Sequence, residues 1–242
     1  MKFKKPSFWD LRKPNFISNI LYPLSIITKI NNLIINSKNK KKYKKPKTIC
    51  VGNIYVGGTG KTPATIKLYN MLKNSKSNIS VGKKFYNSQI DEQIILKRKT
   101  NLILEKFRKE IIKKATQTNE DFLIFDDGLQ DKYVDYDLKI VCFDGKKWIG
   151  NGRLLPAGPL RETLKSIKKY DIVLLKNKDN KAEEIINLIK SINSNIEIFI
   201  TNYKPLNLSQ LNQNDKFLIF SGIGNPESFK NILKKSNLEI VK

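Results

Sequence analysis

The feature that most constrains this chain is a glycine-rich turn that follows a short apolar run, residues 48–51, and ends in a lysine and a threonine. Backbone N–H groups in such a turn can point at phosphate oxygens, the lysine can span the β- and γ-phosphates, and the threonine hydroxyl can bind Mg²⁺. The pattern therefore predicts a P-loop that binds a nucleoside triphosphate. Its candidate residues are Gly57, Gly58, Thr59, Gly60, Lys61 and Thr62.

Residues 61–73 are predicted to form the helix after this loop, with the positive end of its dipole toward the same phosphates. One position departs from the strict pattern, because Tyr55 stands five residues before Gly60, where the pattern has glycine. A glycine-rich turn before a helix can also be purely structural. The apolar run, the glycines and the Lys-Thr pair in register favour nucleotide binding.

The chain is strongly basic, with 46 lysines and arginines against 22 acidic residues and a formal net charge of +24 over 242 residues. Such a charge attracts nucleic acid, an anionic membrane or a phosphorylated substrate. A general enrichment in lysine, asparagine and isoleucine is an alternative origin of the charge. A basic P-loop protein acting on nucleic acid stays a minor hypothesis. No nucleic-acid-binding motif is present, and no nucleic acid is predicted as a partner.

The two cysteines, Cys50 and Cys142, lie in apolar runs and are predicted to be buried thiols in a reducing compartment. The sequence shows no metal-ligand cluster. It also contains no histidine, so a general base in this chain must be another residue type.

Residues 16–35 are an apolar stretch with helical spacing, interrupted by Pro23 and flanked by basic residues on both sides. This pattern is typical of a helix that lies in the interface of an anionic membrane. An ordinary core helix is the alternative. A membrane span is disfavoured, because about 20 predominantly apolar residues are needed and this stretch contains many polar ones. No secretory signal is predicted, since no small-residue cleavage site follows.

After Pro46, short apolar strands alternate with helices, which predicts an α/β fold: a P-loop NTPase-like, mostly parallel sheet with helices on both faces, plus the N-terminal amphipathic helix. The expected strands are residues 48–51, 122–125, 139–143, 172–175, 197–201 and 217–220. The expected helices are residues 61–73, 90–97, 104–115, 181–191 and 227–235. Residues 74–87 are expected to be irregular.

The predicted organisation has three parts. Residues 1–46 form a basic, amphipathic, membrane-contacting segment, residues 47–202 form the P-loop core, and residues 203–242 form a shortened C-terminal α/β lobe in which a last strand begins near residue 241.

Apolar residues 122–125 run directly into Asp126 and Asp127. In nucleotide-binding α/β folds such a strand delivers an aspartate to the Mg²⁺ shell, at the edge of the sheet where ligands bind. A strand that ends in an Asp-Gly turn is the alternative. Together with the P-loop, the pair is interpreted as a metal site.

Two further segments carry candidate residues. Residues 151–162 are a loop rich in proline and glycine, in which Arg153 and Arg161 offer forked donors to phosphate. Asp91 and Glu92 open a predicted helix, where acidic residues often only complement the helix dipole.

These segments together resemble the tetraacyldisaccharide 4′-kinases of the lipid A pathway. The resemblance rests on residues 51–63, Asp126-Asp127-Gly128-Leu129-Gln130, residues 150–162 and residues 220–226. Their order and spacing cover most of the chain from Lys47 onward, and residues 153–162 are the most diagnostic piece. An N-terminal membrane-contacting helix is also a feature of this family.

The resemblance implies transfer of the γ-phosphate of ATP to the 4′-hydroxyl of an acylated glucosamine disaccharide 1-phosphate, which forms lipid IVA. The reaction is expected at the cytoplasmic face of the bacterial inner membrane, by a monomer with ATP and Mg²⁺ as cofactors. The implied roles are β/γ-phosphate binding for Lys61, magnesium binding for Thr62, Asp126 and Asp127, support of the metal for Glu92, the general base for Asp91, and contacts to nucleotide phosphate and neighbouring site groups for Arg161 and Glu162.

Three departures from the family pattern support a second hypothesis. Residues 81–86 stand where the family has Arg-Gly-Tyr-Gly, Gln130 is followed by Asp131 instead of histidine, and a C-terminal histidine that partners the base has no counterpart. Loss of such a partner commonly lowers the rate without abolishing binding. The alternative function is therefore a nucleotide-binding but catalytically weak relic or fragment of this family.

Overall fold

The fold is that of a computed structural model, which describes residues 5–176, 182–205, 207–212, 215–221, 226–236 and 238–241. The chain divides into two compact units, Met1–Ile200 and Thr201–Lys242, and each is described by itself. Residues 5–46 belong to the same unit as the P-loop.

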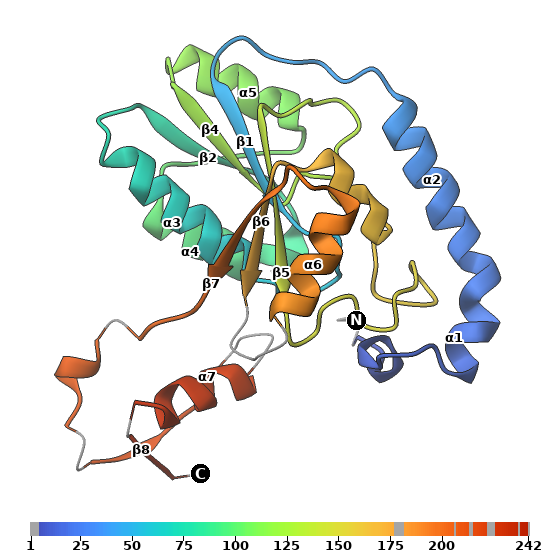
Figure 1. Ribbon diagram of the computed structural model, residues 1–242. Helices are drawn as coiled ribbons and strands as arrows, with labels where there is room; N and C mark the ends of the chain where they lie inside the picture. Colours follow the sequence, from blue (N-terminus) through green and yellow to red (C-terminus); the bar gives the residue numbers. More distant parts are fainter. Residues whose placement is uncertain are drawn as a thin grey trace. The chain divides into compact units, whose positions relative to one another are not determined.

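The first unit is built on a seven-stranded sheet with the order β3-β2-β4-β1-β5-β6-β7 (Figure 1). Neighbouring strands from β3 to β6 run parallel. The chain runs from β1 to β2, β3 and β4 on one side and then crosses to β5 on the other, so the carboxyl ends of β1 and β4 lie at the switch point where such folds bind ligands. The strands are β1 (Lys47–Gly52), β2 (Ile79–Lys84), β3 (Leu102–Glu105), β4 (Phe122–Asp126), β5 (Leu138–Asp144), β6 (Ile172–Lys176) and β7 (Glu197–Thr201).

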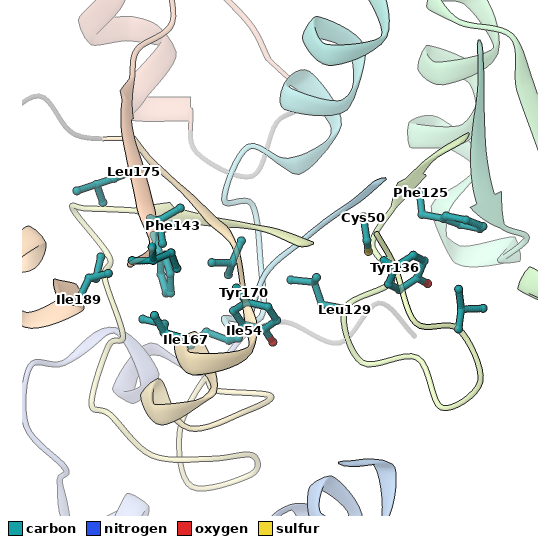
Figure 2. Close-up of a cluster of buried hydrophobic side chains, with 14 of the residues drawn as sticks. Cys50, Ile54, Phe125, Leu129, Tyr136, Phe143, Ile167, Tyr170, Leu175 and Ile189 are labelled. Atoms are coloured by element: carbon teal, nitrogen blue, oxygen red, sulfur yellow. The ribbon is translucent and has the colours of Figure 1, made fainter. Parts of the chain in front are cut away.

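Helices cover both faces of this sheet, which confirms the predicted fold class. On one face α3 (Lys61–Lys73) and α4 (Ile90–Lys99) bury Tyr69 and Leu96 against the strands. On the other face α5 (Arg108–Gln117) and α6 (Ala182–Ile192) pack into a larger cluster. Figure 2 shows this cluster running from Ile189 through Leu129 to Tyr136.

Both cysteines lie in these cores, as predicted. Cys50 and Cys142 are free and buried, and burial raises the pKa of the Cys142 thiol to about 12. Neither thiol is therefore ionised or accessible at neutral pH.

The helix predicted over residues 104–115 is wrong over residues 104–107. Leu102–Glu105 forms β3, which pairs with Val81 to Lys84 of β2, and α5 begins only at Arg108. A short apolar run is compatible with either a strand or a helix, and here its pairing with β2 decides the outcome.

The irregular structure predicted for residues 74–87 is also wrong, because it contains β2. This strand is nearly all buried although it carries Ser80 and Lys83. Each of these polar groups has a carboxylate partner, Glu120 for Ser80 at 2.7 Å and Asp126 for Lys83 at 2.7 Å. The polar residues that argued against a strand in this segment are thus buried in pairs with carboxylates.

The apolar stretch near the N-terminus forms two helices, α1 (Phe16–Leu21) and α2 (Ser25–Ser37), joined by a 3₁₀ turn at Pro23 (Figure 1). One polar edge of these helices faces the protein, and most of their apolar side chains face outward: Ser18 and Ser25 are at most 4% exposed, whereas Phe16 is 76% exposed and Ile27 is 67% exposed. The alternative of an ordinary core helix is therefore wrong. Within the described residues, none of the helices combines the length and the apolar character that crossing a membrane requires.

The second unit contains β8 (Lys216–Leu218), α7 (Pro226–Lys234) and β9 (Glu239–Val241), with β8 and β9 paired in parallel. The predicted last strand is confirmed as β9, and the strand expected over residues 217–220 ends earlier, at Leu218. Residue 181, the first of the helix predicted over residues 181–191, lies outside the described residues. So do residues 222–225 of the family motif at residues 220–226.

Candidate active site

The turn between β1 and α3 has the backbone conformation that a P-loop requires. Gly57 and Gly60 have φ angles of 128° and 89°, in the left-handed region that favours glycine. Asn53 braces the turn from inside, because its buried Nδ2 donates to the carbonyl oxygen of Tyr55, to that of Gly57 at 3.2 Å and to Oγ1 of Thr59 at 3.0 Å. Gly60 is also the N-cap of α3, so the free N–H groups of the first helical turn are available to an anion.

Lys61 and Arg161 converge on the carboxylate of Asp127. Lys61 Nζ lies 3.8 Å from Oδ2, and Arg161 Nη1 lies 2.9 Å from Oδ1 and 3.2 Å from Oδ2. Burial acts to raise the pKa of Asp127, but the two cations outweigh it and hold that pKa below its ordinary value. The carboxylate is ionised at neutral pH, and it holds two cations beside the loop that a triphosphate would occupy.

Asp126 lies deeper and faces the start of α3. Thr62 Oγ1 donates to its Oδ2 at 3.3 Å, Thr65 Oγ1 donates to its Oδ1 at 3.4 Å, and Lys83 Nζ lies 2.7 Å from Oδ2. Burial raises the pKa of Asp126, an effect that Lys83 opposes. For Lys83 burial acts to lower the pKa, but Asp126 and Glu92 outweigh it and raise the pKa, so the ammonium stays charged.

Asp91 and Glu92 stand side by side in the first turn of α4. Glu92 Oε2 lies 2.8 Å from Lys83 Nζ, which links it to Asp126. The side chain of Asp91 is exposed, and no ion pair ties it to another residue in the described part of the chain. The helix start therefore joins the charged cluster through Glu92 and leaves the neighbouring carboxylate open to solvent.

Glu162 reaches the P-loop only through another side chain. It is buried, and its Oε1 accepts hydrogen bonds from Gln130 Nε2 at 2.8 Å and from the Tyr170 hydroxyl at 2.9 Å. Gln130 Nε2 in turn donates to the carbonyl oxygen of Asn53 at 3.0 Å. The predicted site residue Glu162 thus supports the base of the loop.

The loop that contains Arg153 and Arg161 is hydrogen-bonded to the P-loop backbone. The backbone N–H of Arg161 donates to the carbonyl oxygen of Ile54 at 2.7 Å, and that of Val56 donates to the carbonyl oxygen of Pro159 at 2.8 Å. Arg153 points elsewhere, with Nη1 2.8 Å from the carbonyl oxygen of Ser18 in α1. The structure therefore separates the two arginines: Arg161 lies at the site, and Arg153 binds the N-terminal helix.

The polar face of α1 and α2 lies along the same loop. Its side chains donate to four carbonyl oxygens of the loop: Ser18 to Ala157 at 2.6 Å, Ser25 to Leu154 at 3.0 Å, Thr28 to Leu155 at 2.8 Å and Asn32 to Arg161 at 2.7 Å. The N-terminal helices are thus connected to the backbone of the residue whose guanidinium holds Asp127.

Sequence reasoning missed the roles of Lys83 and Asn53. Lys83 lies near the carboxyl end of a strand beside β4, a position that would have marked it as a site candidate if the strand had been recognised. Asn53 lies one residue after β1, and an amide at that point can donate to acceptors within a tight turn.

The fold and this cluster define a P-loop protein of the nucleotide-dependent phosphotransferase type. Residues 17–242 match the family model of tetraacyldisaccharide-1-P 4′-kinases. A tetraacyldisaccharide 4′-kinase of Pelagibacter ubique is 45% identical over 243 residues, which cover 100% of this chain and 76% of the relative, and that of Rickettsia bellii is 33% identical over 258 residues, covering 100% and 78%. The chain therefore belongs to the tetraacyldisaccharide 4′-kinase family.

The fold comparison agrees. The crystal structure of LpxK from Aquifex aeolicus in complex with ATP aligns with a TM-score of 0.69 at 20% identity, over 93% of this chain and 80% of that one. At this identity the likeness concerns the fold.

The Asn53 bracing yields a prediction about the loop. Replacement of Asn53 by alanine removes the amide whose two N–H groups share three acceptors in the turn, and we expect ATP affinity to fall about tenfold, the effect of roughly one lost buried hydrogen bond of 1–1.5 kcal/mol. Displacement of a fluorescent ATP analogue measures this. Asn70→Ala, an exposed position on α3, is the matched control and should bind as the unaltered chain does. Equal affinity of N53A and N70A would contradict the bracing role.

Proposed function

We propose that this chain transfers the γ-phosphate of ATP to the 4′-hydroxyl of tetraacyldisaccharide 1-phosphate and so forms lipid IVA. The observation that carries the proposal is the convergence of Lys61, Arg161 and Asp127 beside a P-loop, in a member of the tetraacyldisaccharide 4′-kinase family. A loose phosphoryl transfer needs positioning and charge stabilisation more than covalent chemistry, and this cluster supplies both.

The P-loop would hold the triphosphate through its backbone N–H groups and Lys61. Arriving phosphates would compete with Asp127 for Lys61 and Arg161, because each cation is held by the carboxylate at hydrogen-bond or ion-pair distance. Arg161 would then stabilise the negative charge of the transferred group. Glu162 would act indirectly, since it fixes Gln130 beneath the loop.

Two of the predicted magnesium ligands, Thr62 and Asp126, would suit that ion. The hydroxyl of Thr62 and the carboxylate of Asp126 lie next to each other. Mg²⁺ prefers oxygen ligands, and proteins commonly bind it through one or two carboxylates together with substrate phosphates and water. Within the described residues, no group of three carboxylate or thiol side chains could hold a metal. Thr62 and Asp126 would hold the ion, with Asp127 and Glu92 in support. Bound Mg²⁺ would neutralise charge on the β- and γ-phosphates.

Asp91 would accept the proton of the 4′-hydroxyl. Its carboxylate is exposed at the start of α4, next to a residue that is linked to Asp126 through Lys83. A base must lie within hydrogen-bond reach of the proton that it removes, and an exposed carboxylate at the rim of the cluster is accessible to a large lipid acceptor.

The outward apolar face of α1 and α2 would lie in the interface of a membrane. Exposed apolar side chains on an otherwise docked helix pair favour burial among acyl chains, and the lysines of residues 38–45 favour an anionic surface. This placement would bring an acylated acceptor to the site at the cytoplasmic face of the bacterial inner membrane. A monomer suffices for this arrangement.

The first prediction from this proposal is transfer of label from γ-³²P-ATP to tetraacyldisaccharide 1-phosphate in detergent micelles. Replacement of Lys61 by alanine should abolish labelling, because the β- and γ-phosphates lose their cation. Replacement of Asp91 by alanine should lower kcat about 1,000-fold while ATP affinity stays within a factor of two, since a positioned base contributes roughly 100- to 10,000-fold.

The outcomes separate the two functional hypotheses. Lysine-dependent labelling supports the kinase and shows that the transfer proceeds without a histidine. ATP binding with no labelling supports the alternative of a catalytically weak relic. Full activity of D91A would refute the assignment of the base.

The membrane proposal predicts binding to vesicles of phosphatidylglycerol and phosphatidylethanolamine. Ile30→Asp places a charge on the outward face of α2, where Ile30 is 51% exposed, and should weaken binding at least tenfold because a buried isoleucine contributes about 1.5–3 kcal/mol. Asn36→Asp adds the same charge at an exposed polar position of α2 and should bind within a factor of two. Co-sedimentation measures both, and equal binding of the two variants would refute an interfacial role for this face.

A further inference from the structure

Lys83 is an ammonium buried between two elements of the site. Its side chain is 2% exposed, and Nζ lies 2.7 Å from Asp126 Oδ2 and 2.8 Å from Glu92 Oε2. Removing a charge from water is costly, and a buried ion pair seldom stabilises a fold more than apolar packing would. Stability alone therefore does not account for a lysine at this point of β2, next to the P-loop.

The ammonium joins the two parts of the site that have different tasks. On one side Asp126 Oδ2 also accepts from Thr62, the residue after the P-loop lysine. On the other side Glu92 belongs to the first turn of α4, directly beside Asp91. No side chain caps the N-terminus of α4, because Gln89 makes no capping hydrogen bond. The Glu92–Lys83–Asp126 bridge is thus the charged link from this helix start to the nucleotide site in the described part of the chain.

We propose that Lys83 is a positioning residue for phosphoryl transfer: by tying Glu92 to Asp126, it holds the start of α4, and with it Asp91, at a fixed place relative to the P-loop. This inference rests on the proposed function, in which Asp91 is the base. Transfer depends on the alignment of base, acceptor and phosphate, whereas ATP binding depends on the loop itself. Loss of the bridge should therefore act on kcat and leave KM for ATP nearly unchanged.

The test compares Lys83→Met, Lys83→Arg and Lys84→Met in the labelling assay with saturating lipid. K83M should lower kcat about 100-fold, the loss that a misplacement of roughly 1 Å produces, with KM for ATP within threefold. K83R keeps a charge that can span two carboxylates and should exceed K83M about tenfold. K84M removes one positive charge from the adjacent, half-buried position and should stay within a factor of two.

A double-mutant cycle shows whether Lys83 acts through Glu92. Glu92→Gln breaks the outer half of the bridge, at a side chain that is 45% exposed, and also removes a carboxylate that would support the metal; it should lower kcat about tenfold. If the bridge works as one unit, K83M/E92Q should have the same kcat as K83M. If the kcat of K83M/E92Q is instead reduced by the product of the two single-variant factors, the two residues act independently and the proposal is overturned.

The remaining outcomes are also decisive. If K83M shows no cooperative thermal unfolding, it is not properly folded, and K83R and E92Q then provide the test. In that case, full kcat in E92Q overturns the proposal. Unchanged kcat in folded K83M, with an active unaltered chain, overturns this inference alone. No transfer by the unaltered chain would overturn the proposed function and this inference with it.

Discussion

The paired charges at the carboxyl ends of β1, β2 and β4 are the interaction on which the site depends. Asp126 ends β4 and Asp127 follows it. Asp126 pairs with Lys83 from β2, and Asp127 pairs with Lys61 from α3 and with Arg161 from the loop after β5. The parallel sheet brings these groups together from positions far apart in the sequence. Each cation is held in place before any phosphate arrives, so the conformational entropy of its side chain is lost on folding and not on ATP binding.

The N-terminal helices reverse the usual arrangement of an amphipathic helix on a globular protein. Their hydroxyl and amide groups donate to carbonyl oxygens of the loop at residues 154–161, and most of their isoleucines and leucines remain outside. Exposed apolar side chains grouped in this way are typical of a surface that binds a membrane or a partner. Asn32 of α2 donates to the carbonyl oxygen of Arg161. This hydrogen bond connects the helix that would contact a membrane to the residue whose guanidinium would contact phosphate.

Much of this arrangement could be predicted from local signals. The P-loop, the paired aspartates and the strand–helix alternation are visible because glycines, carboxylates and apolar runs stand at fixed offsets, and α3 was predicted with its observed bounds. The strand β2 escaped prediction for a physical reason. Ser80 and Lys83 are buried against carboxylates that lie about 40 residues away in the sequence, and no local pattern shows a pairing at that distance. The bridge through Lys83 depends on that strand and was missed with it.

The central claim is that this site phosphorylates one hydroxyl of a lipid disaccharide. The most direct measurement is a ³¹P–¹H correlation spectrum of the product formed from ATP and tetraacyldisaccharide 1-phosphate. We expect a second phosphomonoester whose phosphorus couples to the proton on carbon 4′, beside the unchanged 1-phosphate. A new phosphorus that correlates with another position, or a product that carries only the original phosphate, would contradict it.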